Sequence, residues 1–177
     1  MTEDKRTFKM GKANLMAFVF GIPLIGILIL PYYFAYGIES TNQIRLFFAL
    51  RTFIPAIVIG IIIHEAIHGF TWSIAAKIPI SDIKFGFQIK TVTPFAHCKV
   101  PINIVAYRIG AIMPFLVLGL LPYVYALATK NPVALGFSLF FSFVAIGDLM
   151  ILWITRDIPS DKKVQDHPTE GGVTITD

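Results

Sequence analysis

The chain of 177 residues is 55% hydrophobic and only 15% charged, with a formal net charge of +4. A soluble domain is usually about 45–50% apolar and about 25% charged, and so short a chain has too much surface per volume to bury the excess. This composition excludes an ordinary soluble domain, the 16 Phe exclude a disordered chain, and the single cysteine excludes an internal disulfide. We interpret residues 1–177 as one integral membrane domain.

Four apolar segments, taken in chain order, predict four transmembrane helices. They cover residues 13–36, 47–76, 102–128 and 132–155. Each is long enough to cross the ~30 Å of a bilayer core at ~1.5 Å per residue. In the first segment, Pro23 and Pro31 are expected to bend or end the helix. Residues 157–177 are polar and are predicted to form a short tail.

Residues 80–100, between the second and third segments, have a different periodicity. Apolar side chains alternate with polar residues or glycine from Ile83 to Ile89, and a second alternation centres on Ala96 and Cys98. A period of two is typical of a β-strand. With a turn at 91–94, the pattern predicts a β-hairpin beside the membrane or dipping into it. The predicted fold is a membrane all-α protein of four transmembrane helices with this small β-hairpin.

Lysine and arginine gather on one side of the predicted spans. With the N-terminus inside, the inner segments hold Lys5, Arg6, Lys9, Lys12, Lys77, Lys84, Lys90, Lys99, Arg156, Lys162 and Lys163, and the outer loops hold Arg45, Arg51 and Lys130. Positive residues favour the cytoplasmic side, so we expect both termini and the hairpin there. Because the basic residues flank apolar runs, the expected partners are the lipid bilayer and a membrane protein or peptide substrate, and no nucleic acid.

The second apolar segment contains His64-Glu65-Ala66-Ile67-His68, an H-E-x-x-H motif. Residues four apart lie on one face of a helix, so both imidazoles can reach one metal ion. Glu65 can then deprotonate a water whose pKa Zn²⁺ lowers from about 15.7 toward about 7. An acid inside a span costs roughly 2.5–3.5 kcal/mol on insertion scales, so it needs a reason to be there. The structural alternative is a pair of packed histidines beside a paired glutamate.

A third zinc ligand is needed, because a catalytic zinc normally has three protein ligands. Asp148 is the only other acid within the predicted spans. The motif histidines lie ~12–18 Å from the inner end of their span and Asp148 lies ~10 Å from the inner end of its own, which favours Asp148. The alternatives are an ion pair of Asp148 with Arg108, or a third ligand supplied by His97 or His167.

Three further residues are candidates for substrate binding or oxyanion stabilisation: Arg108, Asn103 and His97. Arg108 could instead extend toward the membrane interface, Asn103 could cap the third helix, and His97 could be a solvated hairpin residue. Gly69, directly after the motif, is expected to allow close packing of its helix.

These motifs together resemble a known family. The resemblance is carried by His64 to Gly69, by the hairpin end from Ala96 to Pro101, by Gly147-Asp148 and by Asp166-His167-Pro168 in the tail. The chain resembles a bacterial membrane family of zincin metallopeptidases and is more distantly similar to the site-2 protease family of intramembrane metalloproteases. The latter resemblance implies zinc held by His64, His68 and Asp148, with Glu65 as general base.

The sequence thus favours a zinc-dependent intramembrane endopeptidase in a bacterial cytoplasmic membrane, acting on membrane-associated protein substrates. An extended substrate could add as a strand to the edge of the hairpin around Ile83–Ile89. The alternative function is a non-catalytic membrane zinc-binding protein, such as a transporter, a sensor or a scaffold.

Overall fold

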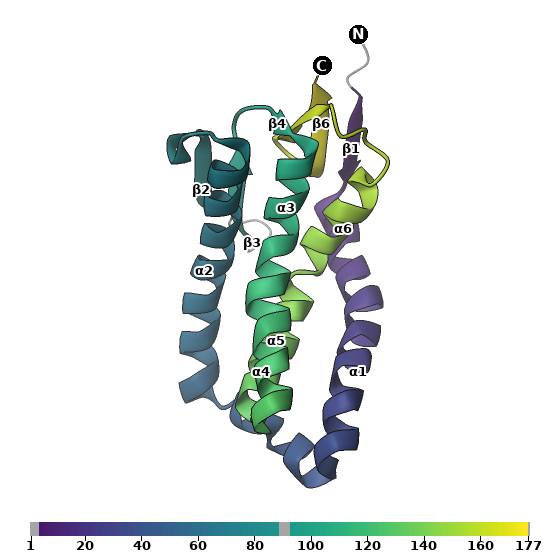
Figure 1. Ribbon diagram of the computed structural model, residues 1–177, viewed down its shortest axis with the longest axis vertical. Helices are drawn as coiled ribbons and strands as arrows, with labels where there is room; N and C mark the ends of the chain where they lie inside the picture. The colour runs from purple at the N-terminus through teal and green to yellow at the C-terminus, as the bar shows by residue number, and fades with distance from the viewer. Residues whose placement is uncertain (1–3, 89–92, 177) are drawn as a thin grey trace. The chain divides into compact units, whose positions relative to one another are not determined.

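The structure, a computed structural model, describes residues 4–88 and 93–176, and it is mostly helical with two small antiparallel sheets (Figure 1). Its elements fall into two compact units. The first unit is built from the described parts of Met1–Leu15, Ile63–Pro114 and Gly147–Asp177, and the second from Met16–Ile62 and Phe115–Ile146. Every residue of the candidate site described below belongs to the first unit.

Three helical stretches are long and apolar enough to cross a bilayer: Leu15–Leu46, Leu50–Ala76 and Ile104–Thr129. The first contains most of α1 (Met10–Asn42) and the short helix η1 (Gln43–Leu46), and the second is α2 (Leu50–Ala76). The third runs from α3 (Ile104–Pro114) through a π-helical turn, η3 (Phe115–Leu120), into α4 (Leu121–Thr129). Within the described residues there are four spans if α5 (Pro132–Val144) and α6 (Ile146–Thr155) count as one broken span.

Two of the sequence-based helix predictions need correction. Pro23 and Pro31 do not end α1, whose backbone leaves the helical region only at Gly37, with φ 75° and ψ 175°. An apolar helix tolerates proline, whereas a positive φ is readily adopted only without a Cβ. The predicted continuous helix over 132–155 is interrupted at Ala145, which ends α5 and whose N–H bonds back to the carbonyls of Phe141 and Phe143.

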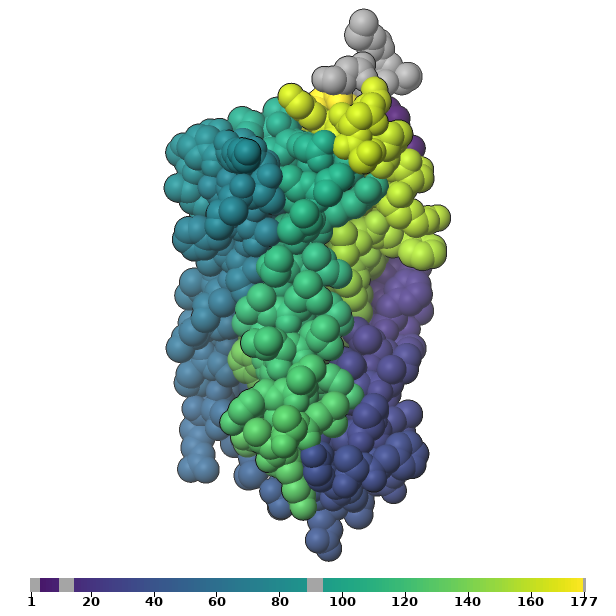
Figure 2. Space-filling model, in the orientation of Figure 1, coloured from purple at the N-terminus to yellow at the C-terminus, as the bar shows by residue number. Residues whose placement is uncertain are grey.

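The first unit contains a four-stranded antiparallel sheet that the sequence analysis did not predict. Its strands, in spatial order, are β1 (Lys5–Phe8), β6 (Gly171–Thr176), β5 (Lys163–Asp166) and β4 (Ile102–Asn103). The predicted tail, 157–177, thus supplies two strands of this sheet, and the third helix begins at Ile104, two residues after the expected start near 102. Val164 and Val173 are fully buried, and their burial stabilises the strands. In Figure 2 the yellow C-terminal strands lie against the start of α3.

The predicted hairpin is confirmed, with β2 (Ile83–Gln88) antiparallel to β3 (Thr93–Cys98) and Ile83 opposite Cys98. Of the predicted turn at 91–94, residues 91 and 92 lie outside the described residues, and Thr93 and Pro94 belong to β3. Phe85 and Phe87 are 45% and 57% exposed. The ring of Phe85 packs on Gly69 of α2 so closely that a Cβ there would overlap it. Gly69 therefore allows close packing of α2 against the strand β2, rather than against a second helix.

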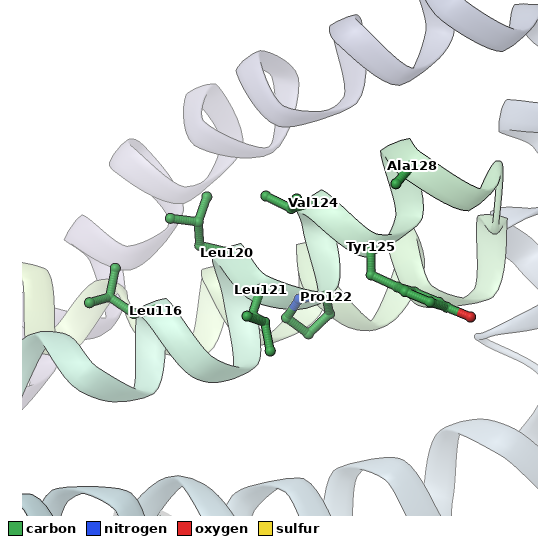
Figure 3. A pocket seen from close by; sticks show the side chains of 7 residues that line it. All are labelled: Leu116, Leu120, Leu121, Pro122, Val124, Tyr125 and Ala128. Atoms are coloured by element: carbon green, nitrogen blue, oxygen red, sulfur yellow. The ribbon is translucent and has the colours of Figure 1, made fainter.

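Each unit has its own apolar core. In the first unit the core joins the end of α2, the hairpin, α3 and the four-stranded sheet, through Trp72, Ile83, Cys98, Ile102, Ile104, Tyr107, Ile158, Val164 and Val173. In the second unit it forms around Tyr32, Tyr123, Ala126, Leu135 and Leu139. The outer face of η3 and α4 carries an open apolar groove of about 790 Å³, lined by the seven residues shown in Figure 3. This lining matches a lipid-facing surface.

Candidate metal centre

The two motif histidines lie on one face of α2, as their four-residue spacing requires. Both are buried, with 5% of their surface exposed. Their Nε2 atoms are 3.2 Å apart, and the rings meet nearly edge to face at 77°. The two imidazoles therefore point into one small space.

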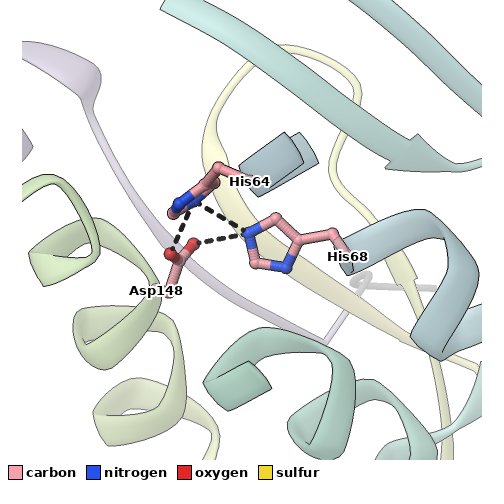
Figure 4. A group of neighbouring side chains, drawn as sticks. All are labelled: His64, His68 and Asp148. Atoms are coloured by element: carbon pink, nitrogen blue, oxygen red, sulfur yellow. Dashed lines mark hydrogen bonds and ion pairs between the residues drawn. The ribbon is translucent and has the colours of Figure 1, made fainter. Parts of the chain in front are cut away.

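Asp148, in the first turn of α6, completes a group of three (Figure 4). Its Oδ2 is 3.1 Å from Nε2 of His64, and its Oδ1 is 3.2 Å from Nε2 of His68. Among the described residues, this is the group of histidine, cysteine and acidic side chains whose ligand atoms all lie close enough to hold a metal ion. The sequence-based assignment of Asp148, rather than His97 or His167, agrees with this geometry.

The ligand atoms of these three residues lie close enough to share one metal ion. Bonds of about 2.0–2.1 Å to a tetrahedral zinc place its ligand atoms about 3.3 Å from one another. The two Nε2 atoms are 3.2 Å apart, each lies 3.1–3.2 Å from a different oxygen of Asp148, and one ligand atom from each residue lies within 4.8 Å of the other two. Two imidazole nitrogens and one carboxylate oxygen also form the donor set of a catalytic zinc, which keeps one position for water or substrate. The residues present therefore fit zinc.

A backbone carbonyl sets the tautomer of His68. Its Nδ1 lies 2.9 Å from the carbonyl oxygen of Gly110 in α3. Because a carbonyl can only accept a hydrogen bond, Nδ1 carries a proton, and in the neutral ring the lone pair is then on Nε2, which faces His64 and Asp148. A metal-ligating histidine is typically held in this way by its other ring nitrogen.

Glu65 lies beside the ligand group without belonging to it. Its carboxylate accepts a hydrogen bond from the backbone N–H of Ala96 in β3 and interacts electrostatically with His64, His68 and Asp148. The hairpin thus contacts the residue between the two motif histidines. Glu65 therefore lies next to the three residues that could hold a metal ion.

A column of rings supports His68, and the sequence analysis did not predict it. The His68 ring stacks on Trp72 at 5.3 Å and 18°, and Trp72 stacks on Tyr107 at 5.3 Å and 12°. The indole Nε1 of Trp72 donates to the carbonyl of Tyr107 at 3.0 Å. The sequence could have indicated it, because Trp72 follows His68 at the same four-residue spacing that separates His68 from His64, which places all three on one helix face.

The remaining candidates lie elsewhere in the first unit. Arg108 donates to the carbonyls of Thr155 and Ile158, so it caps the end of α6. Asn103 accepts from the N–H of Val105 and donates to the carbonyl of Ser160, which is the capping role considered above. His97 pairs with Lys84 across the hairpin, and Nδ1 of His167 accepts backbone N–H bonds from Thr169 and Glu170.

Two ionisable groups at the junction of β3 and β5 have shifted pKa values. Burial raises the pKa of the Cys98 thiol to about 11, so the thiol is neutral at pH 7 and donates to the carbonyl of Val100. Burial also raises the pKa of Asp166, against the lowering effect of hydrogen bonds from Tyr107 and from the Cys98 N–H. Cys98 is therefore neither a thiolate ligand nor an activated nucleophile.

The fold and site define a mostly helical protein with a buried His–His–Asp group suited to a metal ion. A family model described as "Putative zincin peptidase" matches residues 57–162, more than half of the chain. The chain belongs to this zincin peptidase family. The match includes the motif helix, the hairpin and Asp148, and it ends before β5. No curated protein and no solved structure matched the chain.

Proposed function

We propose that the protein is a zinc-dependent intramembrane endopeptidase that hydrolyses peptide bonds of membrane-associated protein substrates. The observation that carries the proposal is the triangle of ligand atoms formed by His64, His68 and Asp148 in a chain of the zincin peptidase family. The apolar helices that carry the ligands support a site within the membrane.

The roles of the residues follow from their positions. Zinc held by His64, His68 and Asp148 would supply Lewis acidity, which polarises the scissile carbonyl and lowers the pKa of water. Glu65 takes the proton from the attacking water and returns it to the leaving amine. The Ala96 N–H holds the Glu65 carboxylate in orientation, and the Gly110 carbonyl keeps His68 in the tautomer that can ligate.

The substrate is proposed to bind as an extended strand against a free edge of the hairpin. The outer edge of β3 is occupied, because Ala96 and Cys98 donate there to Glu65 and Asp166, so the edge of β2 is the one that offers backbone groups to an added strand. Two contacts support its use as a platform: Phe85 packs on Gly69 of the motif helix, and Ala96 bonds to Glu65. A substrate helix must unwind to expose its peptide bonds. Hydrogen bonds to the added strand then replace the helical hydrogen bonds that its backbone N–H and C=O groups lose.

Both termini are proposed to lie in the cytoplasm, with the protein in a bacterial cytoplasmic membrane. The pairing of β1 with β6 supports a common side, because Lys5 lies opposite Thr174 and Phe8 opposite Gly171. Termini on one side require an even number of crossings. This requirement supports four spans, with α5 and α6 forming the fourth.

The decisive test is Glu65→Gln in purified full-length protein. The variant is expected to retain zinc at wild-type stoichiometry, measured by atomic emission, and to lose cleavage of a panel of apolar fluorogenic peptides in detergent micelles. The exposed Glu39→Gln is the matched control and keeps activity. Full cleavage by Glu65→Gln would overturn the proposed mechanism. Zinc uptake into proteoliposomes that survives Glu65→Gln but not Asp148→Ala would instead establish a transporter.

A further inference from the structure

Asp166, at the end of β5, joins two parts of the first unit that reach the metal centre. Its Oδ1 accepts from the Tyr107 hydroxyl at 2.5 Å, and its Oδ2 accepts from the backbone N–H of Cys98 at 2.7 Å. Both carboxylate oxygens are therefore used, by α3 on one side and by the hairpin on the other. Asp166 lies beyond the segment that the family model matches.

The first connection leads to a candidate metal ligand through stacked rings. Tyr107 is held at its hydroxyl by Asp166, and its ring stacks on Trp72, which in turn stacks on His68. Tyr107 and Trp72 are almost fully buried, so the rings have little room to move separately. The stack thus connects Tyr107 to the imidazole of His68, whose Nε2 faces His64 and Asp148.

The second connection leads to Glu65 through β3. Ala96 and Cys98 are two residues apart, so their N–H groups point to the same edge of the strand. Cys98 donates there to Asp166, and Ala96 donates to Glu65. One carboxylate thus fixes the strand whose backbone orients Glu65.

We propose that Asp166 is a positioning residue of the metal centre, which acts on His68 through the Tyr107–Trp72 column and on Glu65 through β3. The proposal rests on the proposed function for its catalytic consequence. Its effect on metal binding stands apart from peptidase activity. On this proposal the four-stranded sheet helps to position the metal centre, because β5 carries Asp166 and β6 pairs with β5.

The chain offers a direct reporter of the column. It has two tryptophans, and the exposed Trp153 can be removed by Trp153→Phe, which leaves Trp72 as the sole indole. In this background, zinc titration is followed by Trp72 fluorescence and by competition with a chromophoric chelator. Asp166→Ala is expected to weaken zinc binding about 10-fold, the lower end of the range for residues that hold a metal ligand in place. It is also expected to change the Trp72 fluorescence signal that zinc induces. In cleavage assays kcat falls and KM stays near its wild-type value.

Three companion variants separate positioning from general stabilisation. Gln165→Ala removes a neighbouring bond from β5, in which the Gln165 side chain donates to the carbonyl of Lys99 directly after β3, and is expected to leave zinc affinity unchanged. Tyr107→Phe keeps the stacked ring, loses only the hydroxyl, and is expected to weaken zinc binding as Asp166→Ala does. The double variant Asp166→Ala/Tyr107→Phe should bind zinc as well as Asp166→Ala alone, because Asp166→Ala already removes the bond to the Tyr107 hydroxyl. Asp166→Asn retains one acceptor oxygen and is expected to restore part of the affinity.

The outcomes distinguish the two proposals. If wild-type protein binds zinc but cleaves nothing, the peptidase proposal fails and the positioning role of Asp166 is still decided by the zinc titration. If Asp166→Ala and Tyr107→Phe both bind zinc as Gln165→Ala does, with unchanged Trp72 fluorescence, the positioning role is wrong. If Asp166→Ala does not fold, Tyr107→Phe decides.

Discussion

The indole of Trp72 lies against Gly110 so closely that a Cβ at position 110 would overlap the ring. The same glycine accepts the Nδ1–H of His68 through its carbonyl, so one backbone position supports both rings. Gly110→Ala is therefore expected to push Trp72 out of the column, destabilise the protein by about 1–3 kcal/mol and weaken zinc binding. Thermal unfolding and chelator competition measure the two effects.

Gly26→Ala is the control for that change, because a Cβ at Gly26 meets no atom within 4 Å. This variant should be neutral or slightly stabilising, since alanine is the better helix former. Equal behaviour of the two alanine variants would contradict the tight packing at Gly110.

Asp148 supplies the one carboxylate of the ligand group, and its removal leaves two histidines. Asp148→Ala should weaken zinc binding by more than the roughly 10–100-fold that loss of an outer-shell partner costs. Dialysis against a chelator should empty the wild-type site and abolish cleavage, and added zinc should restore it. Asp157→Ala, which removes an exposed ion pair with Arg6, is the control. Wild-type zinc affinity in Asp148→Ala would remove this residue from the site.

Arg108 is expected to contribute to stability rather than to chemistry. Its guanidinium donates to two backbone carbonyls at the end of α6, and charge-assisted bonds of this kind are worth about 1.5–3 kcal/mol. Arg108→Ala should lower the unfolding temperature clearly more than Arg156→Ala, whose exposed guanidinium lies over the Trp153 ring. A large loss of kcat with unchanged unfolding temperature would show that Arg108 acts on the substrate.

The pairing of β1 with β6 predicts that both ends of the chain lie on one side of the membrane. Cysteines introduced at the exposed positions Lys9 and Pro168 should react with a membrane-impermeant maleimide only in inverted vesicles, and one at Thr129 only in right-side-out vesicles. The native thiol gives little background, since Cys98 is fully buried. Labelling of Lys9→Cys and Pro168→Cys from opposite sides would contradict four spans.

The buried thiol of Cys98 also predicts a pH dependence of stability. Burial raises its pKa from 9.0 to about 11, so between these values the unfolded chain releases a proton that the folded chain keeps. Stability should therefore fall as the pH rises from about 9 to about 11, by at most about 2.7 kcal/mol. The measured quantity is the unfolding free energy of wild type minus that of Cys98→Ala across this range. A constant difference would contradict the shift.

Helical spacing was enough to predict that His64 and His68 share a face, and the scarcity of intramembrane acids was enough to single out Asp148. The hairpin was predictable because its alternation extends over several residues. The four-stranded sheet was not, because β4 has two residues and the apolar positions of β5 and β6 are too few to form a pattern. The Tyr107–Trp72 stack and the Asp166 bonds are contacts between distant segments, which no local periodicity encodes.

The order of strands in the sheet also has a consequence for biosynthesis. β1 is the first described strand to leave the ribosome, and its neighbour β6 is the last. β1 must therefore wait without its partner until every apolar helix has been translated. The sheet is completed only once β6 has been made, so β5, which carries Asp166, gains this neighbour only after all the described helices have been translated.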